Sequence, residues 1–133
     1  MIGLVLVTHG RLAEEFVHAL THIVGPQEKI ETVCIGADDK MDTRRTDIAA
    51  AVNRVDQGNG VIILTDMLGG TPSNLTLSFL QEGKVEVVTG VNLPMLMKLA
   101  HIRDQQDLRE AALALKQSGQ KGIAVASEVL KKK

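Results

Sequence analysis

Four short apolar runs, separated by stretches with helical spacing, constrain the fold of this chain more than any other feature. The runs are Ile2 to Val7, Ile30 to Ile35, Val61 to Thr65 and Val85 to Thr89. Short, largely apolar runs that alternate with helical patterns are typical of the strands of a parallel sheet. Between the first two runs, apolar residues recur at intervals of three or four at Leu12, Phe16, Leu20 and Ile23. This alternation of strands and helices predicts an α/β fold.

The pattern predicts a three-layer open sheet of four parallel strands in the order 2-1-3-4, with helices on both faces. Further helices are expected before Gly58, over Pro72 to Gln81, from Asn92 to His101, and from Asp107 to Gly119. The stretch Gly122 to Ala126 predicts a last, C-terminal strand. With 133 residues, 44% of them hydrophobic, the chain is expected to form one domain over residues 1–133.

Two loops that follow predicted strands contain the residues of a candidate catalytic site. The first strand leads into His9, and the third leads into Asp66. Ligands of open parallel sheets bind beyond the carboxyl ends of the strands, so we expect these two side chains to face each other. A carboxylate that accepts the Nδ1–H bond would leave Nε2 of the imidazole free as a neutral nucleophile. We therefore predict that His9 is the nucleophile and that Asp66 orients it.

The loop after Asp66 also has features that favour binding of a phosphoryl group. Gly69 and Gly70 let backbone N–H groups approach an anion, and Thr71 and Ser73 lie where the next helix is expected to begin. Arg11 is a further candidate for contact with phosphoryl oxygens, although an arginine at a helix start is often only solvated. Thr71 is equally explained as a helix cap.

The apolar pair Met67 and Leu68 lies in the same loop, and we predict that it forms a docking surface for partner proteins.

Composition excludes several other classes of function. A formal net charge of -1 and only two aromatic residues argue against nucleic-acid binding. There is no phosphate-binding P-loop pattern, no apolar run long enough to span a membrane, and no signal-peptide pattern at the start. Glu14, His18 and His22 share one helix face, but such a stripe is usually solvated. We predict a cytoplasmic protein without membrane insertion, metal or other cofactor.

Three segments carry a resemblance to a known family. They are Val-Thr-His-Gly at residues 7–10, Thr-Asp-Met-Leu-Gly-Gly-Thr-Pro-Ser-Asn at residues 65–74, and Gly-Val-Asn-Leu-Pro-Met-Leu at residues 90–96. In these segments the sequence resembles mannose-type enzyme IIA of the bacterial phosphoenolpyruvate-dependent sugar phosphotransferase system. The resemblance implies a phosphotransferase with a phosphohistidine intermediate. In it, His9 accepts a phosphoryl group from the histidine-containing phosphocarrier protein and passes it to an enzyme IIB, while Asp66 holds His9 by a hydrogen bond.

The resemblance also implies a homodimer, in which the C-terminal strand at Gly122 to Ala126 pairs antiparallel with the sheet of the other subunit and is exchanged between subunits.

Other functions stay open at this point. The chain could act as a regulatory module whose phosphorylation controls binding to another protein, or as the phosphoryl donor of dihydroxyacetone kinase. A histidine phosphatase would have arginine before the histidine, where this chain has Thr8, and a serine hydrolase would have a G-x-S-x-G pattern, which is missing.

Overall fold

The computed structural model describes residues 1–131 and has the predicted α/β architecture. Its strands are all parallel: β1 (Gly3–His9), β2 (Ile30–Ile35), β3 (Val61–Thr65) and β4 (Val85–Thr89). Within the described residues they form a four-stranded sheet in the order β2-β1-β3-β4, which confirms the predicted order. The predicted domain extends to residue 133, and residues 132 and 133 lie outside the described part of the chain.

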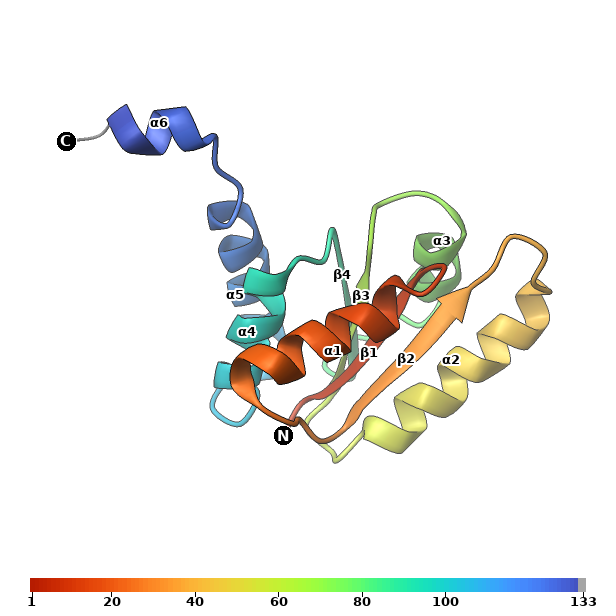
Figure 1. The fold of residues 1–133 in the computed structure, drawn as a ribbon. Coiled ribbons are helices and arrows are strands. Elements are labelled where there is room, and N and C mark those ends of the chain that lie inside the picture. The colour runs from red at the N-terminus through yellow and green to blue at the C-terminus, as the bar shows by residue number, and fades with distance from the viewer. Residues whose placement is uncertain (132–133) are drawn as a thin grey trace.

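Helices cover both faces of this sheet (Figure 1). In chain order, the helices of the described chain are α1 (Leu12–Val24), α2 (Met41–Val55), α3 (Thr71–Leu77), α4 (Leu93–Ile102), α5 (Leu108–Lys121) and α6 (Ala126–Lys131). α1, α4 and α5 pack on one face, and α2 and α3 pack on the other. The two cores divide the alternating side chains of β1, with Leu4 and Leu6 on the first face and Val5 and Val7 on the second. The central strands are thereby buried on both sides, as their continuous apolar sequence predicts.

The segment Gly122 to Ala126, which was predicted to be a strand paired with the other subunit, is not a strand in the described single chain. α5 ends at Lys121, and α6 begins at Ala126, so this segment is a turn and a short linker among the described residues. A strand needs a neighbouring strand to satisfy its N–H and C=O groups. The segment leaves the body of the molecule, where no strand of its own sheet lies beside it (Figure 1).

Two predicted helices also differ in detail. α3 ends at Leu77 and not at Gln81, because the chain turns through short-range bonds such as that from Phe79 N–H to the Thr76 carbonyl. On the predicted buried face of α1, Leu20 is buried, whereas Leu12 and Ile23 at the ends of the helix are 48% and 47% exposed.

One buried arginine joins the amino ends of two strands. The Arg103 guanidinium donates two hydrogen bonds to the Ile2 carbonyl, at 3.0 and 2.8 Å, and one to the Lys29 carbonyl at 2.9 Å. Its side chain is buried, and this burial lowers its pKa. Because these carbonyls lie at the starts of β1 and β2, Arg103 fixes the end of the sheet opposite to the candidate site.

Replacing Arg103 by methionine is expected to destabilise the fold by about 2–4 kcal/mol, since it removes three charged hydrogen bonds and leaves the carbonyl of the buried residue Ile2 without these donors, whereas the Lys29 carbonyl still accepts the Leu4 N–H bond. Urea unfolding measures this loss. The matched control is Arg45→Met, which removes an exposed arginine whose guanidinium lies 3.4 Å from Asp42, and is expected to cost less than about 0.5 kcal/mol. Equal losses in the two variants would show that Arg103 has no special role.

Candidate functional site

The side chains of His9 and Asp66 meet between the carboxyl ends of β1 and β3. His9 is the last residue of β1, and Asp66 directly follows β3, its parallel neighbour. Asp66 Oδ2 lies 2.8 Å from Nδ1 of the His9 ring and accepts the backbone N–H bond of His9 at 3.0 Å. One carboxylate oxygen therefore holds both the ring and the backbone of the same histidine.

The environment keeps the Asp66 carboxylate ionised. Its side chain is only 13% exposed, and this burial by itself would raise its pKa. The hydrogen bonds from the His9 backbone and ring, together with attraction to the ring, outweigh that effect and bring the pKa of Asp66 below its ordinary value of 3.8. An ionised carboxylate is an acceptor only, so the ring must place a proton on Nδ1, and the neutral ring then carries its lone pair on Nε2.

Gly70 lies against the edge of the His9 ring that carries Nε2. A Cβ atom placed on Gly70 would lie 3.4 Å from Nε2 and 3.3 Å from Cε1. The φ angle of Gly70 is +83°, a conformation that residues with side chains rarely adopt. Glycine therefore leaves the space beside Nε2 free, and the His9 side chain is 48% exposed at this position.

The other predicted phosphate-binding residues lie in different environments. Thr71 is the first residue of α3, and Gly70, not Thr71, occupies the N-cap position. Ser73 is fully buried, and its hydroxyl has no hydrogen-bond partner among the described residues, as is also true of Asp66 Oδ1. Arg11 is exposed, and its Nε donates to Glu14 at 2.9 Å. The structure thus brings Gly70 to His9, whereas Arg11 is engaged along α1.

Comparison with known proteins places this site in a family. Residues 3–116 match the family described as the PTS system fructose IIA component, where PTS stands for phosphotransferase system. The chain belongs to the mannose-type enzyme IIA family. Proteins of this enzyme IIA family are components of phosphotransferase systems.

Relatives and solved structures agree with this assignment. The chain is 27% identical over 133 residues to the fructose-specific EIIA component of Bacillus subtilis, covering 99% of this chain and 91% of the relative. It is 28% identical to the mannose-specific EIIAB component of Escherichia coli, covering 92% of this chain but only 38% of that longer protein. The structure of the mannose/sorbose-specific IIA subunit from Enterococcus faecalis is 30% identical, covers 93% of each chain and has a TM-score of 0.80. EIIA from Streptococcus agalactiae, 26% identical and covering 96% of this chain and 99% of its own, has a TM-score of 0.87.

Apolar side chains border the site of this enzyme IIA. Met67 is 53% exposed and Leu68 is 72% exposed, and both lie in the loop between Asp66 and Gly69. Leu12, which the helical spacing assigns to a buried face, is exposed three residues after His9. The first residue of a helix often projects beyond the core. Helical spacing alone does not show this, so it assigned Leu12 to the buried face.

Sequence inspection missed one buried polar contact beside the site. The Thr8 hydroxyl accepts the Ala13 N–H bond at 2.7 Å. A capping side chain normally bonds to an N–H two or three residues ahead, so a bond that spans five residues has no recognised sequence signal.

Residues 1–131 contain neither a cluster of metal-binding side chains nor a membrane-spanning helix. No group of three or more His, Cys, Asp or Glu side chains is arranged to hold a metal ion. None of the helices in this range combines the length and the apolar character that crossing a bilayer requires.

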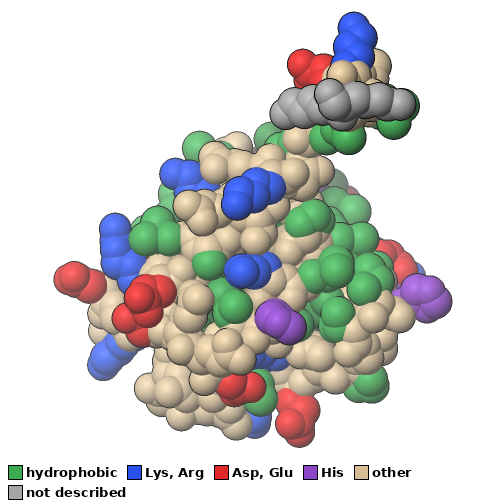
Figure 2. Space-filling view, turned by 90° about the vertical axis from the view of Figure 1, so that its left-hand side faces the viewer, with side chains coloured by type: hydrophobic (Ala, Val, Ile, Leu, Met, Phe, Trp, Pro, Cys, Tyr) green, Lys and Arg blue, Asp and Glu red, His purple; other side chains and the backbone are tan. Residues whose placement is uncertain are grey.

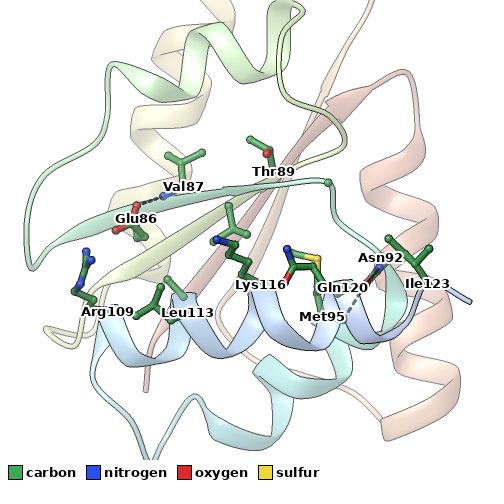
Figure 3. Close-up of a pocket in the computed structure, with 14 residues that line it drawn as sticks. Glu86, Val87, Thr89, Asn92, Met95, Arg109, Leu113, Lys116, Gln120 and Ile123 are labelled. Atoms are coloured by element: carbon green, nitrogen blue, oxygen red, sulfur yellow. Dashed lines mark hydrogen bonds between the residues drawn. The ribbon is translucent and has the colours of Figure 1, made fainter.

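A separate groove of about 580 Å³, whose lining does not include His9, lies between β4 and α5 (Figure 3). Its lining includes the apolar residues Val88, Met95 and Leu113 and the charged residues Glu86, Arg109 and Lys116. Figure 3 shows Glu86 of β4 and Arg109 of α5 at one end of the groove and Lys116 further along it.

Proposed function

We propose that this chain is a phosphoryl carrier of a sugar phosphotransferase system. A single domain over residues 1–133 accepts a phosphoryl group from the histidine-containing phosphocarrier protein on His9, and passes it to an enzyme IIB in the cytoplasm. The observation that supports this most strongly is the 2.8 Å contact between Nδ1 of His9 and the Asp66 carboxylate. This contact leaves Nε2 available as the nucleophile, on a ring that is half-exposed. Family membership supports the same class of reaction.

The proposed step transfers one phosphoryl group between two imidazoles. The Nε2 lone pair of His9 attacks the phosphorus, the N–P bond of the donor breaks, and the donor imidazole leaves with that electron pair. The Nδ1 proton of His9 stays on the ring, which becomes positively charged, and the ionised Asp66 stabilises this charge at 2.8 Å. Imidazole is a good leaving group, so the same step runs onward to the enzyme IIB.

We propose that the loop after Asp66 binds the phosphoryl oxygens. Gly70 lies beside Nε2, and its backbone, with that of Gly69 and the hydroxyl of Thr71, would supply neutral donors. Arg11 would first have to leave Glu14, and the hydroxyl of Ser73 is buried, so both would contact the phosphoryl group only after a local movement.

Exposed Met67 and Leu68 fit a docking role in this exchange. The donor phosphorus must come within bonding distance of Nε2, so the surface of the donor protein must pack against the residues that border the site. Both side chains are more than half exposed there and would be buried by the partner.

The function is tested by incubating the chain with phosphocarrier that has been charged from phosphoenolpyruvate. A carrier accumulates a stable, acid-labile label and loses it when enzyme IIB is added. Continuous release of inorganic phosphate would instead indicate a phosphatase. A label that is not discharged to enzyme IIB, together with phosphorylation-dependent capture of a kinase or regulator, would support the regulatory role or the role as a donor to dihydroxyacetone kinase. A chain that stays unlabelled would contradict the proposal.

We also propose that the carrier is a homodimer in which a second copy covers the groove beside β4. β4 is an edge strand whose outer side pairs with no strand of its own sheet, although Val85 exchanges backbone hydrogen bonds with Gln81 there. Three apolar side chains of the C-terminal part are exposed: Ile123 lines the groove, Val125 lies in the linker after α5, and Leu130 lies on α6. Figure 2 shows α6 standing off the body of the molecule with hydrophobic side chains on its surface.

Sedimentation tests this dimer. The wild type is expected to sediment as a dimer, and Leu113→Asp, which places a charge in the groove, is expected to shift it to a monomer. Leu80→Asp is the control, because Leu80 is similarly exposed but lies outside the groove. A wild type that is monomeric at all concentrations would contradict the proposed dimer.

A further inference from the structure

A buried hydrogen bond joins the end of β1 to the start of α1, on either side of His9. Thr8 is fully buried, and its Oγ1 accepts the N–H bond of Ala13, which is also fully buried, at 2.7 Å. The first N–H groups of a helix have no acceptor within the helix, so an external acceptor must satisfy them. Thr8 supplies that acceptor from the strand that precedes the helix.

The start of α1 lacks the usual alternative. Its N-cap residue is Arg11, which makes no side-chain capping bond. The side chain of Arg11 is instead paired with Glu14. The hydroxyl of Thr8 is therefore the side-chain group that connects the first turn of α1 to the sheet.

This bond closes a short loop that contains His9. Within the loop, the Gly10 N–H donates to the Ile35 carbonyl at 2.9 Å, and the His9 N–H donates to Asp66. Thr8 faces the α1 side of the sheet, and successive side chains of a strand alternate between faces. Thr8 therefore acts on His9 through the backbone and not by contact with the ring.

We infer that Thr8 is a positioning residue for His9. Its bond to Ala13 fixes the loop so that Nδ1 stays on Asp66 while Nε2 stays beside Gly70. The expected change in transfer rate rests on the proposed phosphoryl transfer. The expected change in the tautomer of the His9 ring does not.

The test replaces Thr8 by valine, which keeps the shape of the side chain and removes the hydroxyl. Nitrogen-15 NMR of the His9 ring is expected to show the Nδ1–H tautomer in the wild type and a mixture of tautomers in Thr8→Val. The maximal rate of labelling by the charged phosphocarrier is expected to fall by about 10- to 100-fold, with little change in the phosphocarrier concentration that gives half the maximal rate. Thr8→Ser restores the hydroxyl and is expected to recover both the tautomer and the rate.

Two further variants separate positioning from a general loss of stability. Ile48→Val removes one methylene from the buried core on the α2 face, and its loss of stability in urea is compared with that of Thr8→Val. It is expected to leave the tautomer and the rate unchanged. If Thr8→Val fails to fold, Thr8→Ala leaves space for a water to bond the Ala13 N–H, and the same loss of rate is expected, because a water does not join the helix to the strand.

A Thr8→Val or Thr8→Ala variant with the wild-type tautomer and rate would overturn the inference, as would equal kinetic losses in Ile48→Val. A wild type that takes up no label would overturn the proposed function alone. The NMR comparison would still decide whether Thr8 positions the ring.

Discussion

The variant His9→Gln is expected to fold like the wild type and to take up no phosphoryl group from the charged phosphocarrier. Glutamine is polar and similar in length, and His9 is half-exposed at the end of β1, so little packing is lost. An amide nitrogen has no lone pair available for attack on phosphorus. Labelling is therefore expected to fall by at least about 10³-fold, to background.

His18→Gln is the matched control for this experiment. Nδ1 of His18 also lies near a carboxylate, at 3.2 Å from Glu15, but on the exposed surface of α1. Its replacement is expected to leave labelling unchanged. Circular dichroism of both variants checks the fold, and a His9→Gln protein that is still labelled would show that another residue carries the phosphoryl group.

The variant Asp66→Ala is expected to slow phosphoryl transfer by about 10² to 10⁴, the range for a group that orients or charges a catalytic residue. The change removes the acceptor that selects the Nδ1–H tautomer, and it removes the negative charge that stabilises the phosphorylated ring. Because the pKa of Asp66 is lowered in the folded protein, the carboxylate stays ionised at any pH well above 3.8. The loss in Asp66→Ala is therefore expected to be similar across the neutral range, as rapid-quench labelling at several pH values would measure.

Two variants refine this prediction. Asp66→Asn keeps an acceptor oxygen but loses the charge, so its rate is expected to lie between those of the wild type and Asp66→Ala. Asp39→Ala removes another carboxylate from the same end of the sheet, one that accepts the Gly36 N–H bond at 2.7 Å, and is expected to change the rate less than about threefold. An unchanged rate in Asp66→Ala would remove Asp66 from the mechanism.

Local sequence predicted most of the sheet, because the central strands β1 and β3 are buried on both faces and are therefore largely apolar, while short runs of mainly β-branched residues mark the half-buried edge strands β2 and β4. The bounds of β2, β3 and β4 match their apolar runs. β1 instead continues through the polar residues Thr8 and His9, since β2 provides hydrogen-bonding partners at Cys34 and Ile35. Local sequence also predicted the helix starts that have a capping side chain. Asn92 and Asp107 accept the N–H bonds of Met95 and Glu110, respectively.

The C-terminal segment shows where local sequence is insufficient. An apolar stretch of five residues after Lys121 is compatible with a strand, but strand formation depends on a neighbour elsewhere in space. In the described chain α6 follows instead, with no residue buried.

The candidate site was predictable to the extent that topology determines it. Parallel neighbours end at the same edge of the sheet, so His9 and Asp66 were expected to meet, and they lie 2.8 Å apart. The burial of Ser73, the pairing of Arg11 with Glu14 and the bond from Ala13 to Thr8 depend on side-chain rotamers and on tertiary neighbours. Of these contacts only the Arg11–Glu14 pair has a recognisable spacing, that of residues three apart on a helix.

The ring nitrogen that carries the phosphoryl group is the most direct test of the proposed mechanism. Phosphorus-31 and nitrogen-15 NMR of the labelled protein would identify it. We predict a phosphorus bonded to Nε2 of His9, with the proton on Nδ1 and the Asp66 carboxylate beside it. Phosphorus on Nδ1 of His9, or on any other residue, would contradict this mechanism.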